Sequence, residues 1–157
     1  MAVTHAVQGA LFEHTERRLL SDGAWLDVSS GWLRDRAARR DDETLFDELV
    51  ATTPWRAERR PMYDRVVDVP RLLSFHDLSI EAPPHPRIAD LRDRLNDTYG
   101  DELGEPFTTA GLCLYRDCND SVAWHGDKIG RGLREDTIVA IVSLAERAPY
   151  ALSPERA

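Results

Sequence analysis

The pattern of apolar and polar positions predicts strands in several parts of the chain. Residues 23–28 alternate between apolar and polar types and run into the turn-forming residues 29–31, which is typical of a strand followed by a turn. Two short strands are predicted at Leu112–Leu114 and Val122–Trp124, and the residues between them, 116–120, form a polar turn.

A longer apolar run and two helical patterns complete the expected elements. Residues 138–144 are almost continuously apolar and β-branched, which suits a strand buried on both faces in a sandwich or barrel. Residues 42–50 predict a short helix with one apolar side, and residues 88–99 predict an amphipathic helix that ends at Gly100. The apolar positions are Leu45, Phe46, Leu49 and Val50 in the first helix and Ile88, Leu91, Leu95 and Tyr99 in the second.

Composition indicates one globular domain with an acidic surface. The 157 residues suffice for a single core, and 42% hydrophobic with 31% charged residues is ordinary for a soluble protein. The net charge is -8. Because nucleic-acid binders usually carry a basic footprint, any contact with DNA or RNA is expected to be local, weak and salt-dependent.

The two cysteines, Cys113 and Cys118, lie on either side of the predicted turn. Their spacing allows a disulfide, and redox sensing by the pair is a remote alternative. The sequence shows no signal peptide and no long apolar stretch, so free thiols in a reducing cytoplasm are the favoured interpretation. We expect a cytoplasmic monomer without membrane attachment.

The segment from Trp55 to Arg71 is locally basic in an otherwise acidic chain. Its arginines outnumber its acids and alternate with apolar and aromatic residues, including Tyr63. Guanidinium groups suit phosphate and aromatic rings suit bases, so a nucleic-acid contact is one interpretation. On composition alone, a surface hairpin with solvated charges is the stronger one. The arginines are Arg56, Arg59, Arg60, Arg65 and Arg71, and the acids are Glu58, Asp64 and Asp68.

His125 and Asp127 are the clearest candidates for metal ligands. Residues i and i+2 of a strand point to the same face, so an imidazole and a carboxylate at this spacing can converge on one cation. Two histidines and one carboxylate form the facial triad of non-haem Fe(II) oxygenases, of which this pair would be two members. Taken alone, the pair is explained better by a strand-end histidine followed by a turn through Gly126.

A longer string around this pair is more specific. It comprises Leu114-Tyr115-Arg116, Ser121-Val122, Trp124-His125-Gly126-Asp127 and, further on, Ile141-Val142-Ser143-Leu144. These residues resemble the AlkB family of Fe(II)/2-oxoglutarate-dependent dioxygenases, which repairs alkylated nucleic acid bases. The resemblance covers residues 55–152 and is weak before them.

The resemblance implies a single α+β, mainly β domain over residues 1–157. Its core would be a double-stranded β-helix, a jelly-roll-like fold, with supporting helices. Residues 107–152 would provide core strands and the metal motif, and residues 1–50 an N-terminal supporting region. Residues 52–77 would form a lid that recognises the nucleotide.

The resemblance also assigns roles to individual residues. His125 and Asp127 match iron ligands, and Tyr115 matches the tyrosine whose hydroxyl contacts the co-substrate 2-oxoglutarate. Cys113 stands where many relatives have an asparagine that hydrogen-bonds this co-substrate, and a thiol is a weaker donor. The expected substrate-binding residues are Trp55, Tyr63, Arg71 in a Pro-Arg-Leu stretch, and Trp124, for which packing in the core is the preferred alternative.

Two further departures from the family pattern bear on activity. Lys128-Ile129 stand where relatives often have an acidic residue that reads the base, so base preference is left open. The family's distal iron-binding histidine and its 2-oxoglutarate-binding arginines are expected well beyond residue 144, whereas this chain ends at Ala157. We therefore expect a C-terminally truncated relative that lacks core strands and holds iron weakly. The other histidines, none of them an expected substitute, are His5, His14, His76 and His85, the last two in a predicted loop.

Three functions remain open from the sequence. The first is oxidative removal of alkyl groups from N-alkylated bases in DNA or RNA, with Fe(II) as cofactor and 2-oxoglutarate as co-substrate, impaired in this chain by the absent ligands. The second is a non-catalytic remnant that binds nucleic acid or a partner through the basic segment. The third is a related dioxygenase that acts on a protein or a small molecule.

Overall fold

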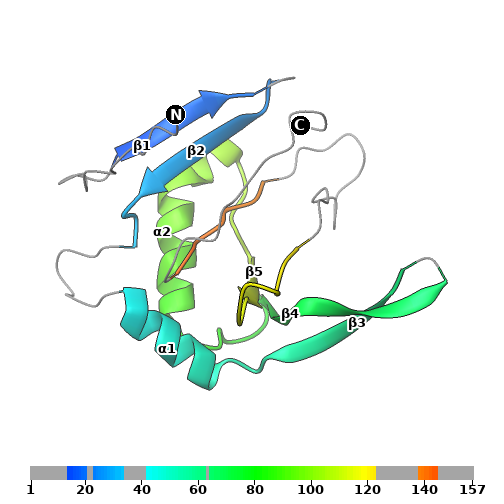
Figure 1. The fold of residues 1–157 in the computed structure, drawn as a ribbon. Coiled ribbons are helices and arrows are strands. Elements are labelled where there is room, and N and C mark those ends of the chain that lie inside the picture. Colours follow the sequence, from blue (N-terminus) through cyan, green and yellow to red (C-terminus); the bar gives the residue numbers. More distant parts are fainter. Residues whose placement is uncertain (1–13, 21–22, 34–41, 63, 123–137, 145–157) are drawn as a thin grey trace, which may run out of the picture.

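The computed structural model describes residues 14–20, 23–33, 42–62, 64–122 and 138–144 (Figure 1). Within these ranges the chain is mainly β with two helices. The elements are β1 (His14–Leu19), β2 (Trp25–Ser30), α1 (Asp42–Thr52), β3 (Arg56–Met62), β4 (Arg65–Asp77), α2 (Pro86–Leu103) and β5 (Thr109–Leu114). They form a two-stranded sheet, β1-β2, and a three-stranded sheet in the order β3-β4-β5. Two small sheets agree with the mainly β prediction, while the double-stranded β-helix stays a prediction.

The N-terminal hairpin confirms the strand predicted from residues 23–28. β2 begins at Trp25 and pairs antiparallel with β1, which the pattern did not predict, in a register that joins Leu19 to Trp25. β2 ends just before Gly31, whose φ of 77° is a left-handed conformation that suits glycine. Figure 1 shows this hairpin across one end of α2, with the three-stranded sheet at the other end.

α1 forms where the apolar spacing predicted it and continues two residues further, to Thr52. Leu45 and Leu49 are buried, whereas Val50, at the edge of the predicted apolar side, is 38% exposed. The N–H of Thr53 still donates to the carbonyl of Leu49 at 3.0 Å, as in the helix, and the N–H of Trp55 then donates to the carbonyl of Thr53 at 2.9 Å, which closes a tight turn. This turn delivers the chain into β3.

α2 begins as predicted but ends later. His85 caps its first turn by accepting a hydrogen bond at Nδ1 from the N–H of Arg87 at 3.2 Å, and a proline follows at the first helical position. The predicted end at Gly100 is wrong. The helix continues to Gly104, whose φ of 70° provides the left-handed cap and whose N–H donates to the carbonyl of Gly100 at 2.9 Å.

The segment between the α2 cap and β5 is tied back to the helix. Asn96 on α2 accepts a hydrogen bond from the backbone N–H of Phe107 at 2.7 Å and donates to its carbonyl at 3.3 Å. The N–H of Leu78 donates to the carbonyl of Thr108 at 2.8 Å. The start of β5 is thus fixed to α2 on one side and to the end of β4 on the other.

His76 lies in β4 and not in a loop, which corrects the prediction. It is buried, its Nε2 lies 2.8 Å from Ser74 Oγ, and its Nδ1 lies 3.4 Å from Glu81. Two polar partners satisfy the imidazole inside the strand, so the polar pattern of this stretch misled the prediction. The apolar core of the described residues consists of Leu33, Leu45, Leu49, Leu78 and Leu91.

Two expected strands are not found. Val122 lies outside regular structure, and the rest of that predicted strand falls outside the described residues. Residues 138–144 are not a strand, and Val139 and Ile141 are 53% and 56% exposed, so the prediction of a strand buried on both faces is wrong. No backbone hydrogen bond joins them to any other described residue. A strand requires a neighbouring strand, which the apolar pattern of one segment does not reveal.

Candidate functional site

Three predicted site residues come together at the edge where β4 meets β5. The register pairs Leu72 with Leu114 and Leu73 with Cys113. Continued by one residue, it sets Arg71 opposite Tyr115. Because side chains alternate between faces of a sheet, Arg71, Cys113 and Tyr115 share one face.

This face of the sheet is the more open of the two. Phe75 is 71% exposed, Tyr115 is 40% exposed and Cys113 is also exposed. On the opposite face, Ser74 and His76 are buried. Cys113 and Tyr115 are therefore accessible from solvent at the sheet edge, whereas Arg71 is half-buried.

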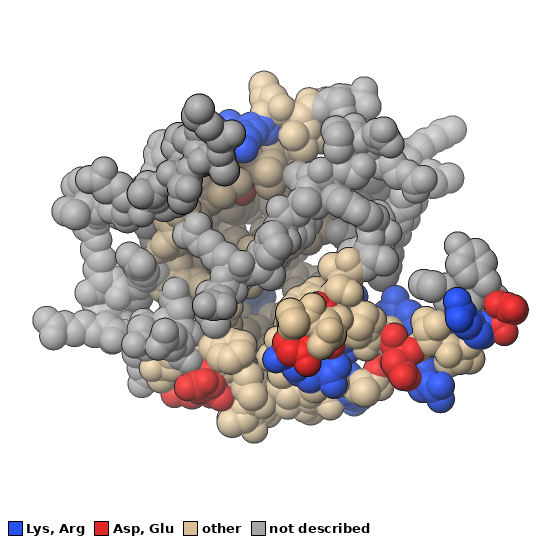
Figure 2. All heavy atoms as spheres, in the orientation of Figure 1, with Lys and Arg blue, Asp and Glu red and all other residues tan. Residues whose placement is uncertain are grey.

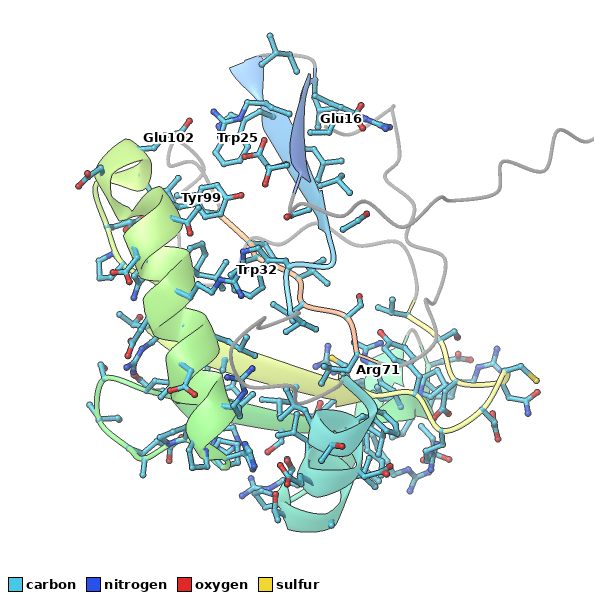
Figure 3. The ribbon with its side chains drawn as sticks, turned by 90° about the vertical axis from the view of Figure 1, so that its left-hand side faces the viewer. Glu16, Trp25, Trp32, Arg71, Tyr99 and Glu102 are labelled. Carbon is cyan, nitrogen blue, oxygen red and sulfur yellow. The ribbon has the colours of Figure 1, made fainter. Side chains whose placement is uncertain are left out.

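Arg71 is held by the segment that leads toward the metal motif. Its Nη1 donates to the backbone carbonyl of Ser121 at 3.1 Å, and the N–H of Ser121 donates to the carbonyl of Pro70 at 2.8 Å. Its Nε is buried and has no hydrogen-bond partner. Figure 3 shows Arg71 on the side of the sheet that is turned toward Trp32. We call Arg71, Cys113, Tyr115 and Ser121 the Arg71 site.

The electrostatics of Tyr115 link these residues. Burial is the main cause that raises the pKa of the Tyr115 phenol above its ordinary value, and the negative charge of Cys113 raises it further. Arg71 lowers this pKa, as a nearby cation does. At neutral pH the phenol is therefore a neutral hydrogen-bond donor beside a guanidinium.

A charged clamp fixes the turn between β5 and Ser121. The backbone N–H of Arg116 and its guanidinium both bind the Asp120 carboxylate, at 2.8 to 2.9 Å. The Asp120 side chain is 5% exposed, and the Arg116 side chain is the main cause that lowers its pKa to about 2. The polar turn predicted at residues 116–120 is confirmed, although the clamp that closes it was not predicted.

The remaining predicted site residues divide into two groups. His125, Asp127, Trp124 and Tyr63 lie outside the described residues, so their roles stay predictions. Trp55 is described, and its indole N–H donates to the carbonyl of Val50 at 3.2 Å, which anchors the start of the hairpin to α1. Among the residues that the structure describes, no group of three or more His, Cys, Asp or Glu side chains could hold a metal ion.

The β3-β4 hairpin presents mixed charges. Arg59 lies 3.0 Å from Asp68, and Arg60 lies 3.1 Å from Glu58. Figure 2 shows blue and red side chains alternating over this arm, in place of one basic patch. Arg56 and Arg65 are exposed and form no ion pair with any described residue. Of the five predicted arginines, Arg59 and Arg60 are thus neutralised by ion pairs, and the other three have no acidic partner among the described residues.

A second polar cluster joins the N-terminal hairpin to α2 (Figure 3). Arg17 binds Asp27 through Nε and Nη2, both at 2.8 Å, and its Nη2 also donates to Glu102 at 2.9 Å. Its guanidinium stacks 4.1 Å from the Trp25 ring centroid, and Trp25 stacks on Tyr99 with ring centroids 6.1 Å apart. These contacts lower the pKa of Asp27, chiefly through the Arg17 hydrogen bonds. We call these five residues the N-terminal junction.

Comparison with known proteins adds no family assignment. No protein-family model matches the sequence, and no curated protein matches it at a significant level. Neither α1 nor α2, the helices of the described ranges, is both long and apolar enough to cross a membrane.

Proposed function

We propose that this chain is an AlkB-like, Fe(II)/2-oxoglutarate-dependent dioxygenase that acts on N-alkylated bases of DNA or RNA. One observation carries the proposal. Tyr115 matches the family's co-substrate tyrosine, and Cys113 stands where many relatives have a co-substrate-binding asparagine; both lie on the open face of the sheet, the face that also carries the half-buried Arg71. From this point the chain continues through Ser121 to His125-Gly126-Asp127.

The described side chains fit a carboxylate co-substrate. The Arg71 Nε is a buried donor with no partner, and the Tyr115 hydroxyl is a neutral donor next to it. A carboxylate accepts hydrogen bonds and compensates a positive charge, so it would satisfy both. Cys113 adds a weaker donor on the same face.

Iron would be held by His125 and Asp127, the two ligands that the sequence offers in a chelating spacing. When bound, iron and 2-oxoglutarate would activate dioxygen, which is the oxidant: one oxygen atom would convert 2-oxoglutarate to succinate and carbon dioxide, and the other would hydroxylate the N-alkyl carbon, which then leaves as an aldehyde. The protein residues position the co-substrate and keep it at the sheet edge. We expect iron binding to depend on both His125 and Asp127.

An anaerobic titration with Fe(II) and 2-oxoglutarate tests this proposal. We expect the visible charge-transfer band of an iron-bound 2-oxo acid, and we expect His125→Ala to abolish it. His5→Ala is the matched control, because His5 lies far from the motif in the sequence and should leave the band unchanged. Absence of the band at millimolar 2-oxoglutarate contradicts the proposal.

A second function is favoured by the exposed hairpin arginines. Arg56 and Arg65 are exposed and have no acidic partner among the described residues, so phosphates could reach them at the base and at the far end of the hairpin, respectively. Non-catalytic binding of single-stranded nucleic acid predicts salt-dependent affinity that persists in the double variant His125→Ala/Asp127→Ala. Loss of binding in that variant counts against this function.

A further inference from the structure

Arg71 differs from the other strand and turn arginines in the edge of the guanidinium that it uses. Arg17 binds Asp27 through Nε and Nη2, and Arg116 binds Asp120 through the same two atoms. Arg18 repeats the arrangement with Glu16. In each of these three arginines the Nε/Nη2 edge receives one carboxylate, in the side-on geometry that matches two oxygens to two N–H groups, and Arg17 also binds Glu102 through Nη1.

In Arg71 this same edge is left without a carboxylate. Only Nη1 is used, in a bond to the neutral carbonyl of Ser121 at 3.1 Å. The Nε is buried and has no partner among the described residues, although a buried donor without a partner is energetically unfavourable. The carbonyl also fixes the orientation of the guanidinium, so that its carboxylate-binding edge is preset.

The surroundings of this edge indicate a small ligand. Tyr115 lies on the same face with its hydroxyl neutral, and Cys113 is next to it along β5. The Nε atom of Arg71 is buried, whereas Arg65, which could meet the phosphates of a long polymer, is exposed at the far end of the hairpin. Arg56 is also exposed, and because it pairs with Leu73, the partner of Cys113, it lies on the same face as the Arg71 site. A two-donor edge with a buried Nε, on the same face as a phenol, suits a planar carboxylate.

We infer that Arg71 and Tyr115 form a carboxylate-binding subsite, in which the Nε/Nη2 edge of Arg71 receives both oxygens and the Tyr115 hydroxyl donates to one of them. Arg71 is then a co-substrate residue and not part of a nucleotide-recognition lid. This inference rests on the proposed function for the identity of the ligand, a small dicarboxylate such as 2-oxoglutarate.

The Nε–H resonance of Arg71 tests the subsite directly. The full chain is labelled with ¹⁵N, the signal is assigned by its loss in Arg71→Lys, and 2-oxoglutarate or succinate is added without metal. We expect the signal to shift with saturation. Arg71→Gln should weaken binding about tenfold to a hundredfold, as expected for the loss of a charge-assisted bidentate pair. Arg71→Lys should recover part of this loss, because it restores the charge without the fork.

Two variants separate a ligand role from a structural one. Tyr115→Phe removes only a hydroxyl, so the fold is retained while binding falls about tenfold. Arg18→Gln is the matched control, since the equivalent edge of Arg18 is already occupied by Glu16, and its binding should equal that of the unmodified protein. Equal binding by the Tyr115→Phe variant overturns the assignment of the phenol.

Other anions define the outcomes that overturn the inference. A response to inorganic phosphate or to a short oligonucleotide, without a response to dicarboxylates, assigns Arg71 to phosphate binding. No response to any anion means that the guanidinium serves only to hold Ser121. If the iron charge-transfer band forms but the Arg71 Nε–H signal does not shift, the proposed function is retained and this subsite is rejected. If the Arg71 signal shifts with dicarboxylates but no iron band forms, the subsite is retained and the proposed function is rejected.

Discussion

The N-terminal junction and the Arg71 site are both built around an arginine on a strand, and they use it in opposite ways. At the junction, Arg17 binds two carboxylates and stacks on Trp25. At the Arg71 site, one carbonyl is the single acceptor found for the guanidinium among the described residues. The first arginine is satisfied by its own chain and the second is not.

This difference distinguishes an arginine whose charge stabilises the fold from one whose charge is free to bind a ligand. A saturated guanidinium stabilises the elements that it connects, and its removal leaves carboxylates such as Asp27, whose side chain is 8% exposed, without a partner. A guanidinium with free N–H donors contributes less to the stability of the fold and can still bind a ligand. Stability and ligand affinity should therefore respond oppositely to equivalent substitutions at the two sites.

The largest expected effect is on stability, from Arg17→Gln. It removes the bonds to Asp27 and Glu102 and the stacking on Trp25, so thermal unfolding should occur several degrees lower. Arg71→Gln should change the melting temperature much less, because one bond to a carbonyl is lost. Equal losses in the two variants, measured by circular dichroism, would contradict the distinction.

A smaller effect, dependent on pH, is expected from the Arg116–Asp120 clamp. The pKa of Asp120 is about 2 in the folded protein and is lowered from an ordinary value of 3.8. The clamp thus stabilises the fold fully above about pH 5 and loses its contribution as the pH falls toward 2.

Asp120→Asn measures this contribution. The difference in unfolding free energy between the unmodified protein and the variant should be constant above about pH 5 and should shrink as the pH falls below about 4. Asp117→Asn, next to the clamp in the same turn, is the control for a general charge effect. A difference that stays constant down to pH 2 would refute the role of the ion pair.

Two glycines of α2 provide a matched pair near the N-terminal junction. Gly104 has a φ of 70°, so Gly104→Ala should destabilise the protein by about 1 kcal/mol. Gly100 lies within the helix, and a methyl group added there would meet no atom within 4 Å, so Gly100→Ala should stabilise the protein by about 0.5–1 kcal/mol. Urea unfolding of both variants checks the opposite signs.

The smallest expected effect is a shift in the titration of Tyr115. Arg71 lowers the pKa of this phenol, so Arg71→Gln should raise the pKa further. Cys113 raises it, so Cys113→Ser should bring it back toward its ordinary value. Phenolate absorbance, with Tyr115→Phe subtracted, gives the pKa. A shift in the other direction in either variant would show that the two side chains do not influence the phenol as described.

Local patterns predicted the elements whose structure depends on neighbours in the sequence. The strands β2 and β5, the helix α1 and the turn at residues 116–120 follow from alternation, apolar spacing and turn chemistry. The end of α2 was misjudged because two glycines stand four residues apart, and only the backbone conformation of Gly104 decides between them. The strand at residues 138–144 was misjudged because its pattern contains no information on a partner.

The candidate site shows the same limit at longer range. Cys113 and Tyr115 could be placed on one face from their spacing of two residues. The approach of Arg71 depends on the pairing of β4 with β5, and the bonds to Ser121 join residues about fifty positions apart. Neither the alternation of β4 nor its composition determines that pairing, so the sequence could suggest Arg71 only as a lid residue.

Asn96 gives α2 an influence on the sheet that its apolar face does not explain. Its amide holds both polar backbone groups of Phe107, as a neighbouring strand would, two residues before β5 begins. A slip of β5 by one residue would exchange its two faces and carry Cys113 and Tyr115 to the buried side. The Asn96 amide on α2 therefore helps to fix the register of β5, and with it which side chains of β5 face solvent.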